Sequence, residues 1–149
     1  MKNFTSETTK ILDDLMEKSS EAYDKGEVEL SKQYLIQAYK SIPNPKEEYD
    51  ESYNYCSYTI TFIINENTKK DDLQQWLNEL VKISVYQDCW KGDVDFFQGK
   101  AYFTMGKYQD AWRHFDDCIK IANSYRYFEG EDPRYIDFYR HPEKYIKES

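Results

Sequence analysis

The chain has 149 residues, enough for one domain, and its 28 acidic residues outnumber its 20 basic ones to give a net charge of −8. A negative field of this size repels nucleic-acid phosphate and anionic lipid, so we expect neither as a main partner. Only 5 Gly and 4 Pro accompany a 17% share of aromatic residues, a composition that favours a helical globular protein with many rings for its helix contacts.

The first predicted element is a helix pair over 12–45, interrupted at Gly26. Aligning Gly26 with the later Gly106 pairs Ala22 with Tyr102, Leu35 with Phe115 and Ala38 with Cys118. Pro43 falls where the second helix should end, because proline cannot continue a helix. Ser19 and Ser31 weaken the match, since they replace a Gly and an Ala of the later copy.

A second pair is predicted over 46–87. One helix is expected from about Glu47 to Asn65, where apolar residues recur at helical spacing: Tyr49, Tyr53, Cys56, Ile60, Ile63 and Ile64. The segment 59–64 is β-branched, but its flanks extend the helical period, so we interpret it as helix rather than strand. After a polar break at 65–70, an amphipathic helix is predicted to extend to about Gln87. Its apolar face is formed by residues at helical spacing: Leu73, Leu77, Leu80 and Val81.

The third pair, 92–125, shows the pattern most fully. Gly106 marks the break between its helices, where a left-handed residue is needed and glycine is free of strain. Small residues fall where the helices cross and aromatic residues where space must be filled: Gly99, Ala101, Tyr102, Tyr108, Ala111, Phe115 and Cys118. In the tail, Asp132 before Pro133 predicts a short capping helix that ends at His141-Pro142.

This spacing resembles the tetratricopeptide repeat, a helix–turn–helix unit of about 34 residues. The resemblance is specific over 92–125, weaker over 12–45 and weakest over 46–91. It implies an all-α fold in which antiparallel helix pairs (about 4–43, 46–87 and 92–125) stack as a short right-handed solenoid in one domain. The tail, 126–149, would cap the exposed apolar face of the last pair.

In the family, the first helix of each pair lines a concave groove, and carrying those positions over predicts the partner-binding residues. They are Tyr23, Asp24, Tyr55, Tyr58, Phe62, Asp93, Phe96, Lys100 and Phe103. The family's carboxylate-binding groove uses Lys, Arg and Asn, whereas only Lys100 is basic here, so the resemblance implies an aromatic groove with an acidic edge. The alternative is that Phe96, Phe103 and Tyr58 contact the tail or a second copy of the chain.

No group of residues in the sequence has the spacing and composition that would predict catalysis, a cofactor or a metal site. His114 and Cys118 have a metal-ligand spacing without further ligands, and His114 with Asp117 resembles a base and its orienting carboxylate without a nucleophile. We interpret His114 and Asp117 as a solvated helix face. Cys56, Cys89 and Cys118 are expected to be reduced thiols, which indicates a reducing compartment and a cytoplasmic protein without a signal peptide or membrane span.

These observations favour a non-enzymatic protein–protein interaction module whose partner is a basic protein. The most specific version is an acidic immunity or antitoxin-type protein that neutralises a cognate toxin. The alternative is a repeat-type adaptor or a secretion or assembly chaperone that binds a peptide segment in its groove. Homodimerisation stays open.

Overall fold

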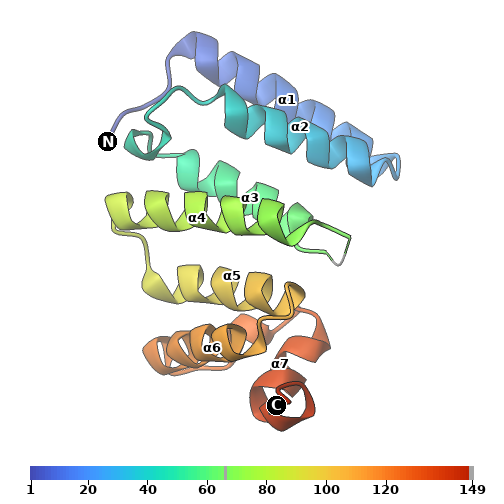
Figure 1. The fold of residues 1–149 in the computed structure, drawn as a ribbon. Helices are drawn as coiled ribbons and strands as arrows, with labels where there is room; N and C mark the ends of the chain where they lie inside the picture. Colours follow the sequence, from blue (N-terminus) through green and yellow to red (C-terminus); the bar gives the residue numbers. More distant parts are fainter. Residues whose placement is uncertain (66, 148–149) are drawn as a thin grey trace. The chain divides into compact units, whose positions relative to one another are not determined.

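The structure, a computed structural model, describes residues 1–65 and 67–147, and most of these residues lie in helices (Figure 1). Its α-helices there are α1 (Ser6–Asp24), α2 (Val28–Ser41), α3 (Ser52–Ile63), α4 (Lys70–Gln87), α5 (Lys91–Thr104), α6 (Tyr108–Ala122) and α7 (Pro133–Arg140). Three 3₁₀ turns are η1 (Lys46–Glu48), η2 (Arg126–Phe128) and η3 (Pro142–Lys144). The all-α class is thereby confirmed. In this described part, no helix has both the length and the apolar content needed to cross a bilayer.

Backbone contacts divide the chain into two compact units. The N-terminal unit comprises Met1–Ile63 and Asn78–Asp88, and the C-terminal unit comprises the remaining described residues. Helix α4 therefore contributes its first part to the C-terminal unit and its second part to the N-terminal unit. The organisation of the whole chain as one repeat domain stays a prediction.

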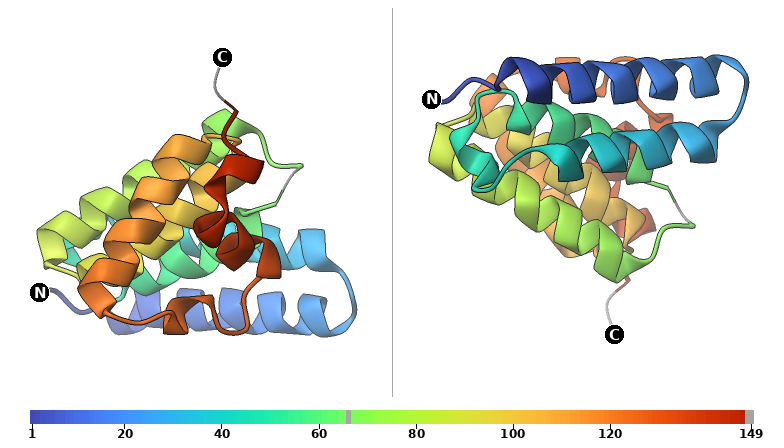
Figure 2. Two further views of the ribbon diagram at one scale, coloured as in Figure 1. Left: turned by 90° about the horizontal axis from the view of Figure 1, so that it is seen from below. Right: turned by 90° about the horizontal axis from the view of Figure 1, so that it is seen from above.

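In the N-terminal unit, α1 and α2 form a hairpin whose helices run side by side in opposite directions (Figures 1 and 2). Gly26 joins them with φ +79°, a left-handed conformation that glycine adopts without strain. The amide of Gly26 donates to the Tyr23 carbonyl at 2.9 Å, and the Glu27 amide donates to the Ala22 carbonyl at 2.8 Å. These bonds satisfy carbonyls at the end of α1 and fix the turn.

The two helices of this hairpin cross at a pair of serines. Ser19 and Ser31 are buried, and each hydroxyl lies within hydrogen-bond distance of the other residue's carbonyl oxygen, at 2.9 and 2.8 Å. The two hydroxyl oxygens are 2.8 Å apart. The replacement of Gly and Ala by serine is therefore compatible with a close crossing, because each small side chain finds its hydrogen-bond partner across the helix interface.

We expect Ser19→Ala to lower the free energy of unfolding by about 1 kcal/mol, because it removes a buried hydrogen bond while keeping the size of the side chain. Chemical denaturation of the full chain measures the loss. Ser20→Ala is the matched control, since Ser20 is the exposed neighbour on the same helix. Equal losses in the two variants would contradict a stabilising role for the serine pair.

Helix α3 begins later than the sequence predicts. The predicted helix from Glu47 starts at Ser52 instead, and Tyr49 is extended, with φ −98° and ψ 129°. The reason is a backbone bridge to the N-terminus: the Lys2 amide donates to the Glu48 carbonyl at 2.9 Å, and the Asp50 amide donates to the Lys2 carbonyl at 3.1 Å. Residues 59–63 are helical, so the interpretation of this β-branched segment as helix is confirmed.

In the C-terminal unit, α5 and α6 form a second hairpin around Gly106, which has φ +77°. Gly99 lies where α5 meets α6, and a Cβ atom added there would approach the Phe115 ring to 2.5 Å. Phe115 is fully buried. The small residue and the large ring thus fill one space together, as the spacing predicts.

The C-terminal segment, which we define as residues 126–146, folds onto this hairpin. Asp132 caps α7 by accepting a hydrogen bond from the Arg134 amide at 2.9 Å, and Pro133 takes the first helical position as predicted. Phe128, Tyr135 and Phe138 join Phe96, Phe103 and Phe115 in one buried cluster. The Trp112 indole donates to the Tyr139 carbonyl at 3.0 Å. This segment therefore belongs to the core of its unit.

Candidate functional site

Aromatic side chains of α3 form one stripe in the N-terminal unit. Tyr55, Tyr58 and Phe62 are three and four residues apart and therefore share a helix face. The ring centroids of Tyr55 and Tyr58 are 6.5 Å apart, and at the far end Phe62 meets Tyr23 of α1 edge-on at 5.9 Å. Phe4 meets Tyr55 edge-on at 6.3 Å at the near end. The stripe thus runs along α3 and is bordered by α1 and the N-terminal residues.

A groove of about 360 Å³ opens between α1 and α3, a volume in the range of small-ligand and side-chain sites. We call it the α1–α3 groove, and it is lined by Met16, Ser19, Ser20, Tyr23, Asp24, Ser31, Leu35, Tyr58, Thr61 and Phe62. Tyr23 and Tyr58 are 56% and 49% exposed, so their rings are available to another molecule. The predicted residues Tyr23, Asp24, Tyr58 and Phe62 are brought together here, and Tyr55 adjoins them.

The groove has an acidic border. Asp24 lines it directly, and a separate hollow on α1 is lined by Asp13, Asp14 and Glu17 together with one cation, Lys10. Burial raises the pKa of the Tyr55 hydroxyl, and the nearby carboxylates of Glu51 and Asp13 raise it further. The N-terminal unit as a whole contains 14 acidic and 8 basic residues. Its surface therefore favours cationic groups over anionic ones.

The predicted groove residues of α5 are placed differently. Phe96 and Phe103 are only 6% and 7% exposed. The Phe96 ring lies 5.5 Å from Phe128, and the Phe103 ring lies 5.3 Å from Tyr135. The open aromatic wall expected at these two residues is therefore absent from the structure, because the C-terminal segment covers them. The alternative of contact with the tail holds for both.

Asp93 and Lys100 also face the C-terminal segment. The Lys100 ammonium pairs with Glu131 at 2.7 Å and lies 5.0 Å from the centre of the Phe96 ring. Asp93 accepts a hydrogen bond from the Tyr127 hydroxyl, whose pKa is raised by burial and by this bond. Four of the nine predicted partner-binding residues thus hold the tail in place, and we leave them out of the candidate binding surface.

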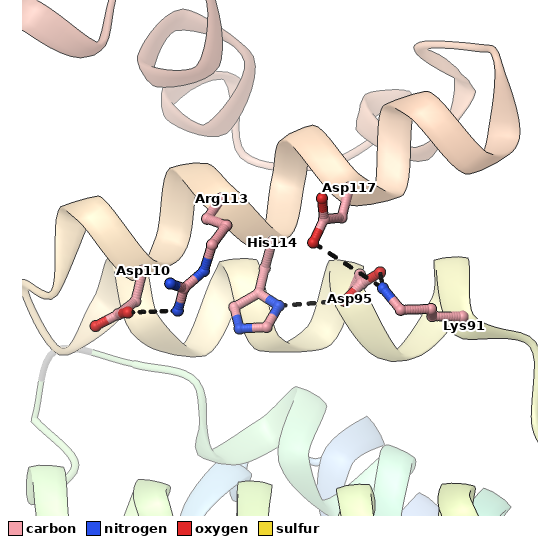
Figure 3. Close-up of polar contacts among 6 residues, drawn as sticks. All are labelled: Lys91, Asp95, Asp110, Arg113, His114 and Asp117. Carbon is pink, nitrogen blue, oxygen red and sulfur yellow. Dashed lines mark hydrogen bonds and ion pairs between the residues drawn. The ribbon is translucent and has the colours of Figure 1, made fainter.

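His114 is part of the interface between α5 and α6. Its Nδ1 lies 3.1 Å from the carboxylate of buried Asp95, which also pairs with Lys91 at 2.6 Å, whereas Asp117 lies 4.0 Å from Lys91 (Figure 3). The His114 ring stacks on Tyr102 at 5.5 Å. The interpretation of His114 as part of a solvated face is therefore wrong, because the carboxylate that orients it comes from the facing helix.

His114 and Cys118 of this hairpin have the spacing of a metal-ligand pair. Among the described residues, no three His, Cys, Asp or Glu side chains gather as a metal site would require. Cys118 is fully buried, and burial raises the pKa of its thiol to about 12. Its surroundings are those of a small apolar core residue.

Burial also sets the reactivity of the three cysteine thiols, none of which is in a disulfide among the described residues. At pH 8 we expect iodoacetamide to modify Cys89, which is partly exposed, far faster than Cys56 or Cys118. A thiol pKa raised to about 12 reduces the thiolate fraction of Cys118 about a thousandfold, and burial raises the pKa of Cys56 as well. Mass spectrometry of the modified peptides gives the rates. Rapid labelling persisting in Cys89→Ser would contradict this ranking.

Sequence reasoning missed several residues of the groove region. Phe4 precedes the N-cap of α1, so no helical period marks it, and Thr61 is polar. Ser19, Ser31 and Leu35 were assigned to helix packing, yet they also line the groove. Comparison of the chain with known protein families, with curated proteins and with solved structures finds no significant match in any of the three. The functional argument therefore rests on the geometry of the site.

Proposed function

We propose that the chain is a non-catalytic protein–protein interaction module that binds its partner in the α1–α3 groove. One observation carries this proposal: a groove lined by Tyr23, Tyr58 and Phe62 is open and has Asp24 at its border. Tyrosine and phenylalanine suit such a role, because each buries a large area while losing only two side-chain torsions on binding.

We propose further that the helix pairs belong to a short right-handed solenoid of the tetratricopeptide-repeat kind, with α7 as its capping element. The equivalence of the two hairpins supports this. The Gly106 amide donates to the Phe103 carbonyl and the Lys107 amide to the Tyr102 carbonyl, which reproduces the Gly26 turn in the second hairpin. In such a solenoid the first helices of successive pairs line one concave wall.

The charge of the chain favours a basic partner, and the specific version we propose is an immunity or antitoxin-type protein in the cytoplasm. An acidic inhibitor is steered toward a basic toxin by long-range attraction, and aromatic contacts then slow its release. The association rate should therefore fall at least tenfold between 0.05 and 0.5 M salt. An association rate that does not depend on salt would remove the electrostatic support for this version.

Site-specific photocrosslinking in the native cell tests the groove. A benzophenone amino acid at Thr61 lies in the groove and leaves every aromatic residue in place, whereas the same group at Val85 is exposed outside it. We expect one protein to crosslink from position 61 and not from position 85. The crosslink should weaken strongly in Tyr23→Ser/Tyr58→Ser and persist in Tyr86→Ser, an exposed tyrosine of the same unit. Capture that is equal in both variants would refute the groove as the site.

An adaptor or chaperone that holds a peptide segment is the second candidate, because a groove of about 360 Å³ is of a size that a few side chains of one segment fill. The two candidate functions differ in whether an isolated peptide of the partner is enough for binding or the folded partner is required. If an isolated peptide cut from the crosslinked region binds within tenfold of the whole partner, the segment-binding function is favoured. If only the folded partner binds, the immunity-type function is favoured.

A further inference from the structure

The two hairpins of the chain allow the groove to be compared with an occupied counterpart. When Gly26 is aligned with Gly106, seven residues that line the α1–α3 groove have counterparts in α5 and α6. Ser19 and Ser31 correspond to Gly99 and Ala111, where the helices cross. The other five, Met16, Ser20, Tyr23, Asp24 and Leu35, correspond to Phe96, Lys100, Phe103, Thr104 and Phe115. The correspondence is structural as well as sequential, because both turns have a left-handed glycine and the same pattern of backbone hydrogen bonds.

In the C-terminal unit these positions contact the chain's own C-terminal segment. The Phe115 ring lies 5.3 Å from Phe128 and 5.8 Å from Tyr135, and Phe138 lies 5.2 Å from Phe103. Glu131 of the segment pairs with Lys100 at 2.7 Å. The Arg134 guanidinium of the segment lies 5.8 Å from the centre of the Phe103 ring. A short segment with large rings and charged residues of both signs therefore packs on this surface of a hairpin.

In the N-terminal unit α3 already covers part of the corresponding surface, since Leu35 is only 3% exposed and the rings of Phe62 and Tyr23 meet at 5.9 Å, and the part that borders the groove differs in charge. Ser20 takes the place of Lys100, so the cation that pairs with an acidic segment is missing at that position. Asp24 takes the place of Thr104, which lies beside Tyr135 of the segment. An acidic segment would therefore meet a carboxylate without a compensating lysine at these two positions, whereas a basic side chain would find Asp24.

We infer that the α1–α3 groove binds a short segment of a partner protein that carries two large aromatic or aliphatic side chains and a lysine or arginine directed at Asp24. The cation of this segment is opposite in sign to Glu131, the residue of the C-terminal segment that pairs with Lys100. This inference rests on the proposed function and deepens it by stating the chemistry of the partner. The rings of the segment pack beside Tyr23, Tyr58 and Phe62, and its cation remains close to the acidic border.

Three fluorescent peptides test the inference by titration against the full chain in 0.15 M salt. The first is the native sequence 126–146, the second carries Glu129→Lys and Glu131→Lys, and the third adds Phe128→Ser and Phe138→Ser to the second. We expect the lysine peptide to bind at least tenfold more tightly than the native one, since a charge-assisted hydrogen bond replaces a like-charge contact. The third peptide should lose at least tenfold again.

Variants of the protein locate the binding. Asp24→Asn should abolish most of the preference for the lysine peptide, and Tyr23→Ser/Tyr58→Ser should weaken its binding at least tenfold. Tyr86→Ser is the matched control and should bind as wild type does. Circular dichroism of each variant establishes that it is folded.

Several outcomes would overturn the inference. It fails if no peptide binds wild type at 1 mM, if the native and lysine peptides bind equally, or if Tyr23→Ser/Tyr58→Ser binds the lysine peptide unchanged. If the crosslink from Thr61 still forms, these results reject the partner chemistry and leave the groove as the site. If the crosslink maps elsewhere while the lysine peptide binds the groove, the proposed function fails instead.

Discussion

Gly99→Ala is expected to lower the free energy of unfolding of the C-terminal unit by about 1–3 kcal/mol, the usual cost of overpacking a core. The result is informative because alanine is otherwise the better helix former, by about 1 kcal/mol in an exposed helix. At this position the added Cβ would lie 2.5 Å from Cδ1 and 2.9 Å from Cγ of Phe115. The Cγ atom is held close to the backbone of α6, so the ring cannot simply swing away. Chemical denaturation of the full chain measures the change.

A double-mutant cycle separates packing from helix propensity. Gly99→Ala should cost less in the Phe115→Leu background, because the smaller side chain leaves room for the added methyl group. Gln98→Ala controls for substitution on the neighbouring position of α5. Stabilisation by Gly99→Ala in the wild-type background would mean that α5 and α6 do not cross as closely as the structure has them.

Features that depend on short stretches of sequence were predictable. Gly26 and Gly106 are followed by amphipathic helices, and a glycine at such a break favours a left-handed turn whatever surrounds it. Asp132 before Pro133 is a local helix-start signal, and the structure has α7 beginning there. These signals act over a few residues, so they can be interpreted without knowing the rest of the fold.

The start of α3 was not predictable in this way. Tyr49 fits the helical period of the residues after it, yet its neighbours Glu48 and Asp50 bond to Lys2, close to the beginning of the chain. No feature of the sequence around Tyr49 announces that partner. A local period therefore overestimates a helix wherever distant backbone competes for the same amides and carbonyls.

The predicted binding residues also divide into those that depend on local spacing and those that depend on distant parts of the chain. Tyr23, Tyr58 and Phe62 line a groove because helical spacing places them on the facing sides of α1 and α3. Phe96 and Phe103 have the same spacing but are covered, and which segment covers a helix face is a long-range property. The aromatic residues of the tail were a signal, since Tyr135 and Phe138 give α7 an apolar face that must be buried against something.

Phe138→Ala is expected to have the largest effect of the single substitutions, a loss of about 3–5 kcal/mol. The Phe138 ring is fully buried and lies 5.2 Å from Phe103, 5.7 Å from Tyr108 and 5.2 Å from Tyr145. Its removal leaves a cavity at the centre of the contact between α7 and the α5–α6 hairpin. Helix α7 is too short to persist without that contact.

The loss should be local before it is global. Hydrogen exchange should accelerate across 126–146 while the amides of α1 and α2 keep their protection, and an apolar dye should bind the uncovered Phe96 and Phe103. Ile136→Ala is the matched control, because this residue of α7 is only partly buried. If Phe138→Ala left exchange in 126–146 unchanged, the segment would not depend on this ring. If the segment 126–146 is released as expected, Phe96 and Phe103 of α5 become exposed, as Tyr23 of α1 already is, and the aromatic positions of both hairpins are then open to a partner.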